Sequence, residues 1–324
     1  MTFNDEVACR KEIGVTITGA VQATALLDIL QKLDDPFLKV RENDRGELEF
    51  RGKKKGFGIT KDAEIFLPID RVEQPEKWKK LPADFTEAVG LVSLCVSGDE
   101  SKFLLCCIHL HPDYVEACDN FQILRCKVDI GLEDSVLVRG TALKDITSLG
   151  MNKMSLTKSW IHFKNADGLI YSCRRYAESY PELDHLLKVK GHKIVLPKGA
   201  VKASDRAAVF AADASGQTQV QVNLVDGRML IKGEGVFGWY KEVSKVAYEG
   251  PPMTFLISPE LLQHISENYS EAVIQNDKLS AKGGHWTYTT VLSAAKEVEE
   301  DGDEDEEEEQ PEKKSKKKKQ GNNE

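Results

Sequence analysis

The segment DYVEACDNFQILRC, residues 113–126, combines side chains that can do chemistry with apolar ones. Cys118 stands directly before Asp119, and a second thiol follows at Cys126. A thiol beside a carboxylate is typical of a nucleophilic or metal-binding site. The same residues also fit a strand that ends in a sharp turn, with Phe121 and Ile123 at the edge of a docking pocket. The choice between these interpretations decides whether the protein is an enzyme.

The catalytic and metal-binding interpretations lack partners in the sequence. A cysteine nucleophile needs a histidine base and a third group that orients it, and the sequence fixes no such trio. His109 and His111 alternate on one strand face near Cys106 and Cys107, but zinc usually takes four ligands in recognisable pairs. No GxxxxGK[ST] or GxGxxG motif stands between a strand and a helix. We expect no catalytic residue, metal or cofactor; a metal-dependent enzyme stays an alternative that a metal assay would test.

Length and composition describe a folded protein without a membrane span. The chain has 324 residues, room for two or three domains, and 41% of them are apolar. No apolar run reaches the length of about 18 residues that a spanning helix needs. The opening MTFNDEVACRKEIG lacks the apolar region of a signal peptide. The seven cysteines are an odd number without CxxC spacing, so we expect reduced thiols and a cytoplasmic location.

An internal repeat organises the chain. A short strand, a helix and a pair of strands recur about every 50 to 60 residues. In the first copy, which opens with a strand at 14–18, Leu26, Ile29, Leu30 and Leu33 form a helical apolar stripe. The helices of the five copies are expected at residues 20–35, 83–95, 141–150, 200–213 and 260–265. Each copy is half a domain, so pairing gives two complete domains and one unpaired half.

Four stretches, in this order, resemble the bacterial sliding clamp, the beta subunit of the replicative DNA polymerase. VEACDNFQILRC resembles a strand and turn of the clamp's middle domain, and YPELDHLLK resembles the segment that follows it. VLPKGAVKASDRAAVFAAD and VAYEGPPMTFLISPELLQHI resemble the two halves of the last domain. The resemblance covers residues 85–295, whereas 14–70 resemble only the second half of the first domain. A bacterial or a bacteriophage clamp fits equally.

The resemblance implies an α+β fold of repeated clamp-type domains, with antiparallel sheets outside and helices lining a central hole. Residues 1–80 are expected to form a partial first domain, 81–190 the middle domain and 191–295 the last domain. Residues 296–324 remain as a charged tail without periodic apolar residues, which predicts disorder.

Function follows from the resemblance as an expectation. A clamp encircles duplex DNA and holds it topologically, so its inner helices need only a modest positive lining that meets phosphates without reading sequence. The expected DNA-binding residues are Lys32, Lys53, Lys54, Lys55, Lys144, Lys198, Lys202 and Arg206. The alternatives are ordinary solvated helix faces and, for Lys53–Lys55, a hairpin end that discourages edge pairing.

A peptide pocket between the middle and last domains is the second expected site. In the family, the polymerase and other DNA-handling proteins insert a short peptide there. Carried over by position, the pocket residues are Phe121, Ile123, Pro181, His185, Leu186, Val291 and Leu292. The alternative is that Ile123 and Leu186 belong to the core. Phe121 stands where the family tends to have a polar residue.

Assembly and partners complete the expectation. A head-to-tail homodimer is the simplest ring, with DNA polymerase and a clamp loader as protein partners. Two chains of five units supply ten, whereas the family uses twelve, so a smaller or distorted ring or a relative that forms no ring also fits. The rival function is a clamp-derived interaction scaffold or inhibitor that keeps the pocket but does not encircle DNA.

Charge is concentrated in the tail. Residues 296–324 hold 7 basic and 13 acidic residues, which leaves 37 basic and 40 acidic residues for the rest, so −6 and −3 of the net −9. A nucleic-acid partner therefore requires the basic residues of the body to gather on one face. The acidic block Asp301–Glu309 and the basic block Lys313–Lys319 fit a solubilising tail, an electrostatic gate on DNA or partner access, or a localisation signal.

Overall fold

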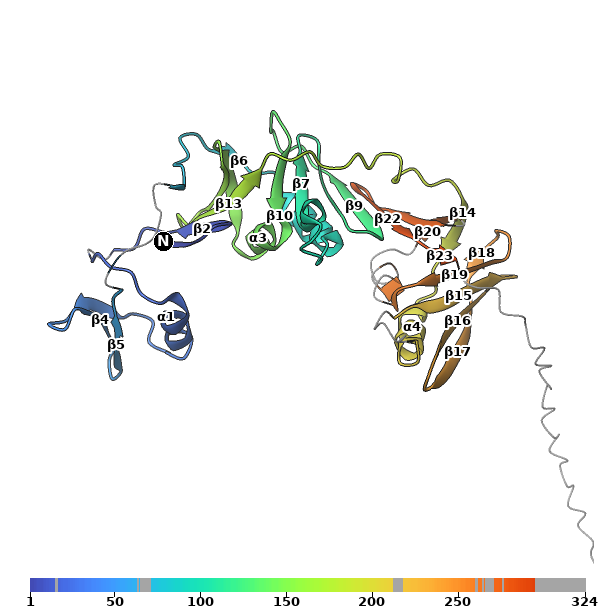
Figure 1. Ribbon diagram of the computed structural model, residues 1–324, viewed down its shortest axis with the longest axis horizontal. Helices are drawn as coiled ribbons and strands as arrows, with labels where there is room; N and C mark the ends of the chain where they lie inside the picture. The colour runs from blue at the N-terminus through green and yellow to red at the C-terminus, as the bar shows by residue number, and fades with distance from the viewer. Residues whose placement is uncertain are drawn as a thin grey trace, which may run out of the picture.

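The computed structural model has the shape of an open arc (Figure 1). It describes residues 1–14, 17–62, 64, 71–211, 218–259, 262–263, 265, 271–275 and 277–294. Sheets form the convex side, and the helices lie on the concave side (Figure 1). The α-helices are α1 (Ala23–Leu30), α2 (Phe85–Val92), α3 (Gly140–Lys144) and α4 (Ala200–Ala208). The expected α+β arrangement, with sheets outside and helices inside, is confirmed.

A continuous antiparallel sheet runs along most of the arc. It has 15 strands, in the order β18-β14-β20-β21-β22-β9-β8-β7-β10-β13-β12-β11-β6, with the hairpin β1–β2 attached to β13. Its strands are β1 (Thr2–Asn4), β2 (Val7–Arg10), β6 (Lys79–Lys80), β7 (Cys107–His111), β8 (Tyr114–Cys118), β9 (Gln122–Lys127), β10 (Val136–Arg139), β11 (Met151–Leu156), β12 (Trp160–Asn165), β13 (Ile170–Tyr176), β14 (His192–Val195), β18 (Ala247–Tyr248), β20 (Glu271–Gln275), β21 (Lys278–Lys282) and β22 (Trp286–Val291). The sheet crosses from the middle to the last part of the chain where β9 pairs with β22.

Two smaller sheets lie at the ends of the arc. The first contains β3 (Lys39–Glu42), β4 (Glu47–Arg51) and β5 (Gly56–Thr60), in that order. The second has the order β17-β16-β15-β19-β23, with β15 (Val220–Val225), β16 (Arg228–Gly235), β17 (Gly238–Lys245), β19 (Met253–Ile257) and β23 (Ser293–Ala294). Strands β5 and β17 are edge strands of their sheets.

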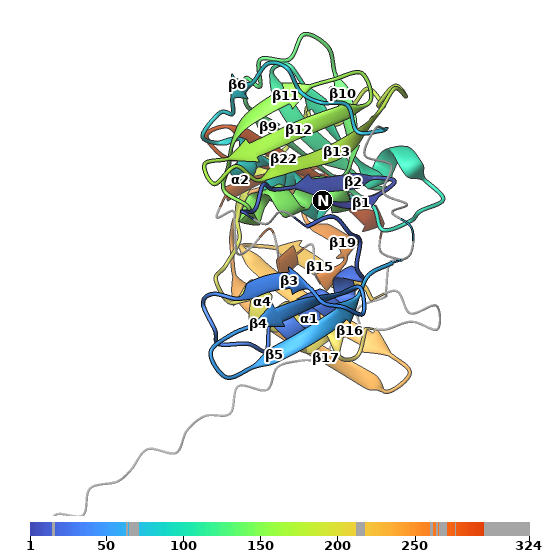
Figure 2. The same ribbon diagram turned by 90° about the vertical axis from the view of Figure 1, so that its left-hand side faces the viewer.

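The repeat is correct in order but incomplete in strands. Each unit has three strands after its helix, whereas the sequence predicted a pair. The strands that the sequence did not predict are β5, β11, β17 and β21. These strands are short or expose charged side chains, so their alternation is weak. The sequence did not predict the hairpin β1–β2 either. Its strand β2 pairs with β13 (Figure 2), and a contact between residues this far apart in the chain leaves no local sequence pattern. The expected strand at 14–18 and helix at 260–265 fall partly outside the described residues.

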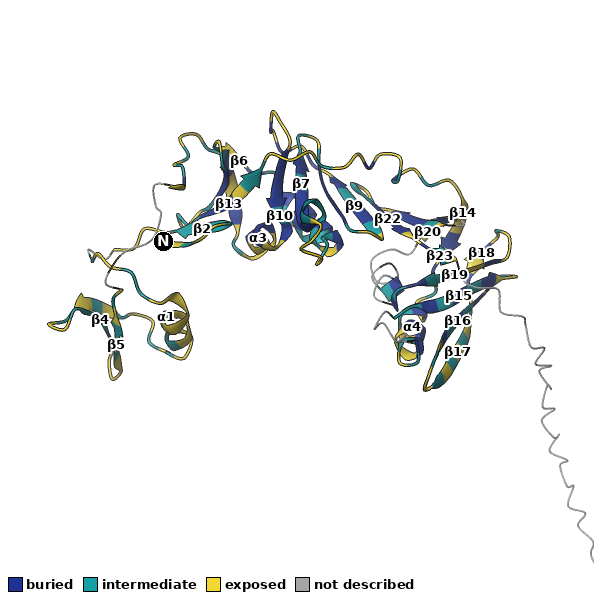
Figure 3. Cartoon of the chain, viewed as in Figure 1, coloured by how far each residue is buried: buried dark blue, intermediate teal, exposed yellow. Residues whose placement is uncertain are grey.

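The middle part of the chain has a complete core. The stripe Phe85, Ala88, Val89 and Val92 of α2 is fully buried, as its spacing predicts. In contrast, none of the residues of α1, all of them described, is buried, and Leu27 is 55% exposed. Figure 3 shows the same contrast between α1 and the strands around β7 and β10. Helix α1 therefore has no buried face of the kind that α2 has, and the half-domain assignment of the first unit stays a prediction.

Helix α4 packs directly on β16. Its small residues Ala203 and Ala207 are buried, which lets the helix backbone approach the sheet closely. A Cβ atom at Gly233 of β16 would lie 1.9 Å from the Ala207 carbonyl oxygen. Only glycine fits at this contact, and the contact sets the distance between the concave helix and its sheet.

Among the described residues, no helix is long and apolar enough to cross a bilayer.

We predict that Gly233→Ala destabilises the last domain, because the methyl group meets backbone that cannot rotate away. Overpacking of this kind costs about 1–3 kcal/mol. Denaturant unfolding followed by circular dichroism measures the loss as a lower transition midpoint. Gly98→Ala is the matched control, since nothing lies within 4 Å of its added Cβ. Equal midpoints for the two variants would contradict the close packing.

Candidate functional site

Each expected lining cation of the helices lies on or next to a helix. Lys32 follows α1, Lys144 is the last residue of α3, and Lys198, Lys202 and Arg206 lie before or on α4. All five side chains are exposed. Helices α1, α3 and α4 all lie on the concave side of the arc (Figure 1), and the DNA-lining role of these exposed cations stays a prediction.

The five cations differ in their local pairing. Arg206 lies 3.2 Å from the carboxylate of Glu242, and its guanidinium stands over the ring of Tyr240. Within the described part of the chain, the ammonium groups of the four lysines have no ion-pair partner: Lys32, Lys144, Lys198 and Lys202. Mobile ammonium groups that are not neutralised suit transient contact with phosphates.

The basic loop Lys53–Lys55 lies next to acidic residues. The ammonium of Lys55 is 3.4 Å from Asp34, and the backbone N–H of Lys53 donates to Asp35 at 3.4 Å. Asp34 and Asp35 come soon after α1, so the loop and Lys32 belong to the same end of the first unit. The carboxylates offset part of the loop's positive charge, which makes the α3 and α4 lysines the stronger candidates for phosphate contact.

The residues 118–122 form a turn. The carboxylate of Asp119 accepts hydrogen bonds from the backbone N–H groups of Phe121 (2.6 Å) and Gln122 (2.8 Å), as an Asx turn does. Burial raises the pKa of the Cys118 thiol, and it raises that of Cys126 to about 12. Both sulfurs are therefore protonated at neutral pH, whereas a nucleophile or metal ligand must be a thiolate.

The structure brings four of the seven expected pocket residues together. The backbone N–H of Val291 donates to the carbonyl of Phe121 at 2.8 Å, and both side chains are about half exposed. Ile123 is buried in a small apolar cluster with Cys118, Leu183 and Leu187, against which Leu186 packs. The result is an apolar floor beside exposed apolar residues.

The other three expected pocket residues are placed differently. Pro181 and His185 are exposed on the segment between β13 and β14. Leu292 is 5% exposed and lies in the main core, with its N–H bonded to the carbonyl of Asp277. Leu94, which the sequence did not single out, is 50% exposed, and its carbonyl accepts a hydrogen bond from Gln122.

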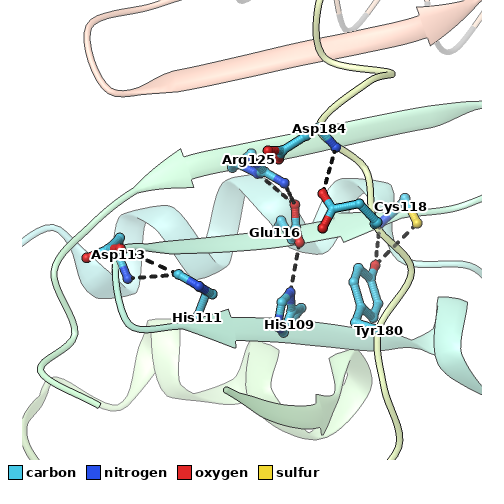
Figure 4. Close-up of polar contacts among 9 residues, drawn as sticks. His109, His111, Asp113, Glu116, Cys118, Arg125, Tyr180 and Asp184 are labelled. Carbon is cyan, nitrogen blue, oxygen red and sulfur yellow. Dashed lines mark hydrogen bonds and ion pairs between the residues drawn. The ribbon is translucent and has the colours of Figure 1, made fainter. Parts of the chain in front are cut away.

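The sequence did not predict a charged network that joins β7, β8 and β9 to the segment between β13 and β14 (Figure 4). Glu116 is 1% exposed and accepts from Arg125 at 2.7 Å, while its other oxygen lies 2.8 Å from Nδ1 of His109. Arg125 also bonds to Asp184 at 2.6 Å and lies 4.1 Å from the ring centre of Tyr114. The pairing holds the pKa of the Asp184 carboxyl below its usual range.

The network fastens the segment between the domains to the sheet. Tyr180 accepts from the backbone N–H of Cys118 at 3.0 Å and donates to its sulfur at 3.3 Å. The ring of His109 stacks on Tyr180 with 4.9 Å between the ring centres. The segment is therefore held at two points, by Tyr180 on Cys118 and by Asp184 on Arg125. These contacts also hold the leucines of the segment beside the predicted pocket: Leu183, Leu186 and Leu187. The sequence signal that could have predicted this network is the polar residues at alternate positions of β7, β8 and β9.

The histidine and cysteine side chains of β7 and its flanking residue are bonded to other groups of the protein. The His109 ring bonds to Glu116, and the thiols of Cys106 and Cys107 bond to backbone carbonyls. In the part of the chain that the structure describes, no group of three or more His, Cys, Asp or Glu side chains is placed to hold a metal ion.

A buried serine–histidine pair is the other arrangement with an enzyme-like appearance. Nδ1 of His162 lies 2.8 Å from the Ser172 hydroxyl, and Nε2 lies 3.0 Å from the Thr157 hydroxyl. Both His162 and Ser172 are almost fully buried, and the adjoining cavity has a volume of about 10 Å³. That space holds one water at most and admits no substrate. The pair ties β12 to β13 beneath the N-terminal hairpin.

Comparisons with known proteins agree with this architecture. No protein-family model matches the sequence, and no curated protein matches it. Solved structures do. A DnaN sliding clamp (DNA polymerase III subunit beta) from Bartonella birtlesii, bound to griselimycin, is 14% identical, with a TM-score of 0.77 over 90% of this chain and 86% of that chain.

The DNA polymerase III beta subunits of Thermotoga maritima and Pseudomonas aeruginosa are similar as well. They are 14% and 13% identical to this chain, with TM-scores of 0.75 and 0.73, and each alignment covers 90% of this chain. The alignments cover 86% and 87% of those chains. The fold is that of a sliding clamp. Identity this low shows the clamp fold and not the activity, which has to be argued from the site.

We predict that His162 makes stability depend on pH. Burial lowers the pKa of His162 to about 4, whereas the unfolded chain has the ordinary value of 6.5. Above pH 6.5 the contribution is fully present. As the pH falls towards 4, the unfolded state takes up a proton that the folded state refuses, and stability falls by about 3 kcal/mol.

Denaturant unfolding between pH 7.5 and about 4 measures this effect, with His162→Gln as the variant that cannot titrate. His192→Gln, on exposed β14, is the control. The difference in unfolding free energy between wild type and His162→Gln should shrink as the pH falls. A difference that is independent of pH would contradict the assignment.

Proposed function

We propose that the chain is a DNA sliding clamp: a non-enzymatic protein that encircles duplex DNA without sequence preference and tethers a replicative DNA polymerase. The observation that supports the proposal is that four exposed lysines, without an ion-pair partner among the described residues, lie on or beside helices of the concave side of an arc whose convex side is a continuous sheet. The site needs no reaction, since its task is topological. Its place is the cytoplasm of a bacterial or phage-infected cell.

Ring closure is proposed through the two edge strands. β5 and β17 lie at opposite ends of the arc (Figure 1), and among the described strands each has one side without a neighbour in its sheet. A head-to-tail dimer joins two different surfaces, and it closes when the rotation between copies is 180°. Pairing β5 of one copy with β17 of the next would extend the convex sheet across the interface and satisfy both edges.

We predict that the chain is retained on nicked circular DNA, in the presence of the host clamp loader and ATP, and is lost when the circle is cut. Lys144→Glu with Lys202→Glu should lower retention by about tenfold, because two phosphate contacts become repulsive. Gel filtration of the DNA complex, with the oligomeric mass measured in parallel, gives both quantities.

Lys153→Glu with Lys158→Glu is the matched control, since both lysines are exposed on or beside β11, away from the concave helices. Equal retention on linear and circular DNA would contradict encirclement. A monomer that binds neither form would contradict the clamp function itself.

The peptide pocket is proposed as the docking site for the polymerase and for the clamp loader. Its support is an apolar floor, Ile123 with Leu186, beside the half-exposed Phe121 and Val291. Pockets of this kind take aromatic or aliphatic anchors of a peptide, and a few residues carry most of the binding energy.

We predict that Phe121→Ala weakens binding of synthetic peptides from the host replicative polymerase by about tenfold or more, measured by fluorescence anisotropy. Phe37→Ala is the control, because Phe37 is 86% exposed in the first unit and lies outside the pocket. If both variants bound the peptides as wild type does, the pocket assignment would be wrong.

The rival function, a clamp-derived scaffold or inhibitor, has one observation in its favour. Helix α1 of the first unit has no buried residue, which fits the predicted half domain. A scaffold of this kind keeps the pocket but leaves the arc open. Peptide binding without retention on circular DNA would select it.

A further inference from the structure

The outer face of the hairpin β16–β17 carries an unusual pairing of charges. On this face Arg228 stands opposite Lys245 and Lys232 opposite Lys241, and the pair between them, Leu230 and Val243, is apolar. The exposed cations here are Arg228, Lys241 and Lys245, while Lys232 is partly exposed and paired with Glu234. Four cations and one carboxylate therefore share the face of two neighbouring strands.

Like charges directly opposite each other in a sheet are unfavourable. Neither Arg228 nor Lys245 has an ion-pair partner among the described residues. Trp239 and Val243, 59% and 58% exposed, add apolar area to the same strand. Lys232 is paired with Glu234 and Lys241 stands over the ring of Trp239, so an anionic partner would stabilise the pair of Arg228 and Lys245 above all.

We propose that this partner is the chain's own acidic segment, Asp301–Glu309, which docks on the outer face of β16–β17. Eight of its nine residues are Asp or Glu. The inference is independent of the proposed clamp function, since it concerns the convex side of the last domain. It gives the tail a binding partner within the same molecule.

The connection is long enough to reach. β23 ends at Ala294 at one edge of the five-stranded sheet, and β16 lies three strands away. Strands are about 4.8 Å apart, so the distance is about 14 Å. The residues between Ala294 and Asp301 span up to about 23 Å when extended.

The concave cations are a less accessible target for the same segment. Helix α4 packs on the opposite face of this sheet, with Ala207 against Gly233. To reach Lys202, the segment would have to pass around the sheet edge and the full thickness of the helix. The outer face requires no such detour, and a short tether gives the segment an effective concentration of about millimolar there.

Zero-length carbodiimide coupling of the full-length protein tests the proposal, because it joins a carboxylate to a lysine only when the two are in direct contact. Mass spectrometry should find peptides that contain 301–309 joined to Lys232, Lys241 or Lys245. These products should exceed those of the control lysines Lys127, Lys153 and Lys158, all exposed elsewhere, by about fivefold or more. They should disappear near 1 M salt, where the screening length is about 3 Å.

Two full-length variants provide the matched comparison. Replacing the acidic residues of 301–309 by Asn and Gln should remove the reactivity, and Arg228→Gln with Lys245→Gln should lower coupling to Lys232 and Lys241 by about fivefold. A mixture of isotope-labelled and unlabelled protein separates coupling within one chain from coupling between copies. Coupling mainly to Lys198 or Lys202, coupling only between copies, or coupling at the level of the control lysines would each overturn the proposal.

Discussion

The pairing of β9 with β22 is the constraint on which the rest of the structure depends. It joins Gln122–Cys126 to Trp286–Thr290 across five register positions, and the bonds Lys127 N–H to His285 and Val291 N–H to Phe121 extend it at both ends. Because an antiparallel ladder fixes both distance and angle, the middle and last parts of the chain become one curved sheet. The helices of both parts then face the same side (Figure 1).

The same junction positions residues of the predicted pocket. The turn at Asp119 places Phe121 directly before β9, where its carbonyl receives the N–H of Val291. The segment after β13 is held beside it by Tyr180 and by the ion pair of Asp184 with Arg125. Removing Arg125 would leave Glu116 buried without its cation, and a loss of this kind costs about 3–5 kcal/mol. The buried charge therefore helps to hold the segment after β13 against the sheet.

Much of this organisation could be predicted from the sequence, for identifiable reasons. The stripe of α2 and the Asp226-Gly227 turn are local patterns, and the structure confirms both, with Asp226 and Gly227 at positive φ. The units were recognisable because the same pattern returns five times. The strands that the sequence did not predict, such as β17, expose every second residue. The exposed residues of β17 are charged or large and apolar, which hides the alternation of polar and apolar side chains. The attachment of β2 to β13 and the ion pair of Arg125 with Asp184 join residues far apart in the chain, and no local pattern encodes them. The roles of the lysines and of the pocket residues stay predictions.

Hydrogen exchange at the β9–β22 junction tests the central claim most directly. If this ladder fixes the curvature of the arc, the amides of Ile123–Lys127 and Thr287–Val291 should exchange as slowly as those of β8. Their exchange should be slowed by a factor on the order of a thousand or more relative to an unstructured chain. Exchange of both strands at the rate of exposed edges, while β8 stays protected, would show that the two parts of the chain move independently and would contradict the claim.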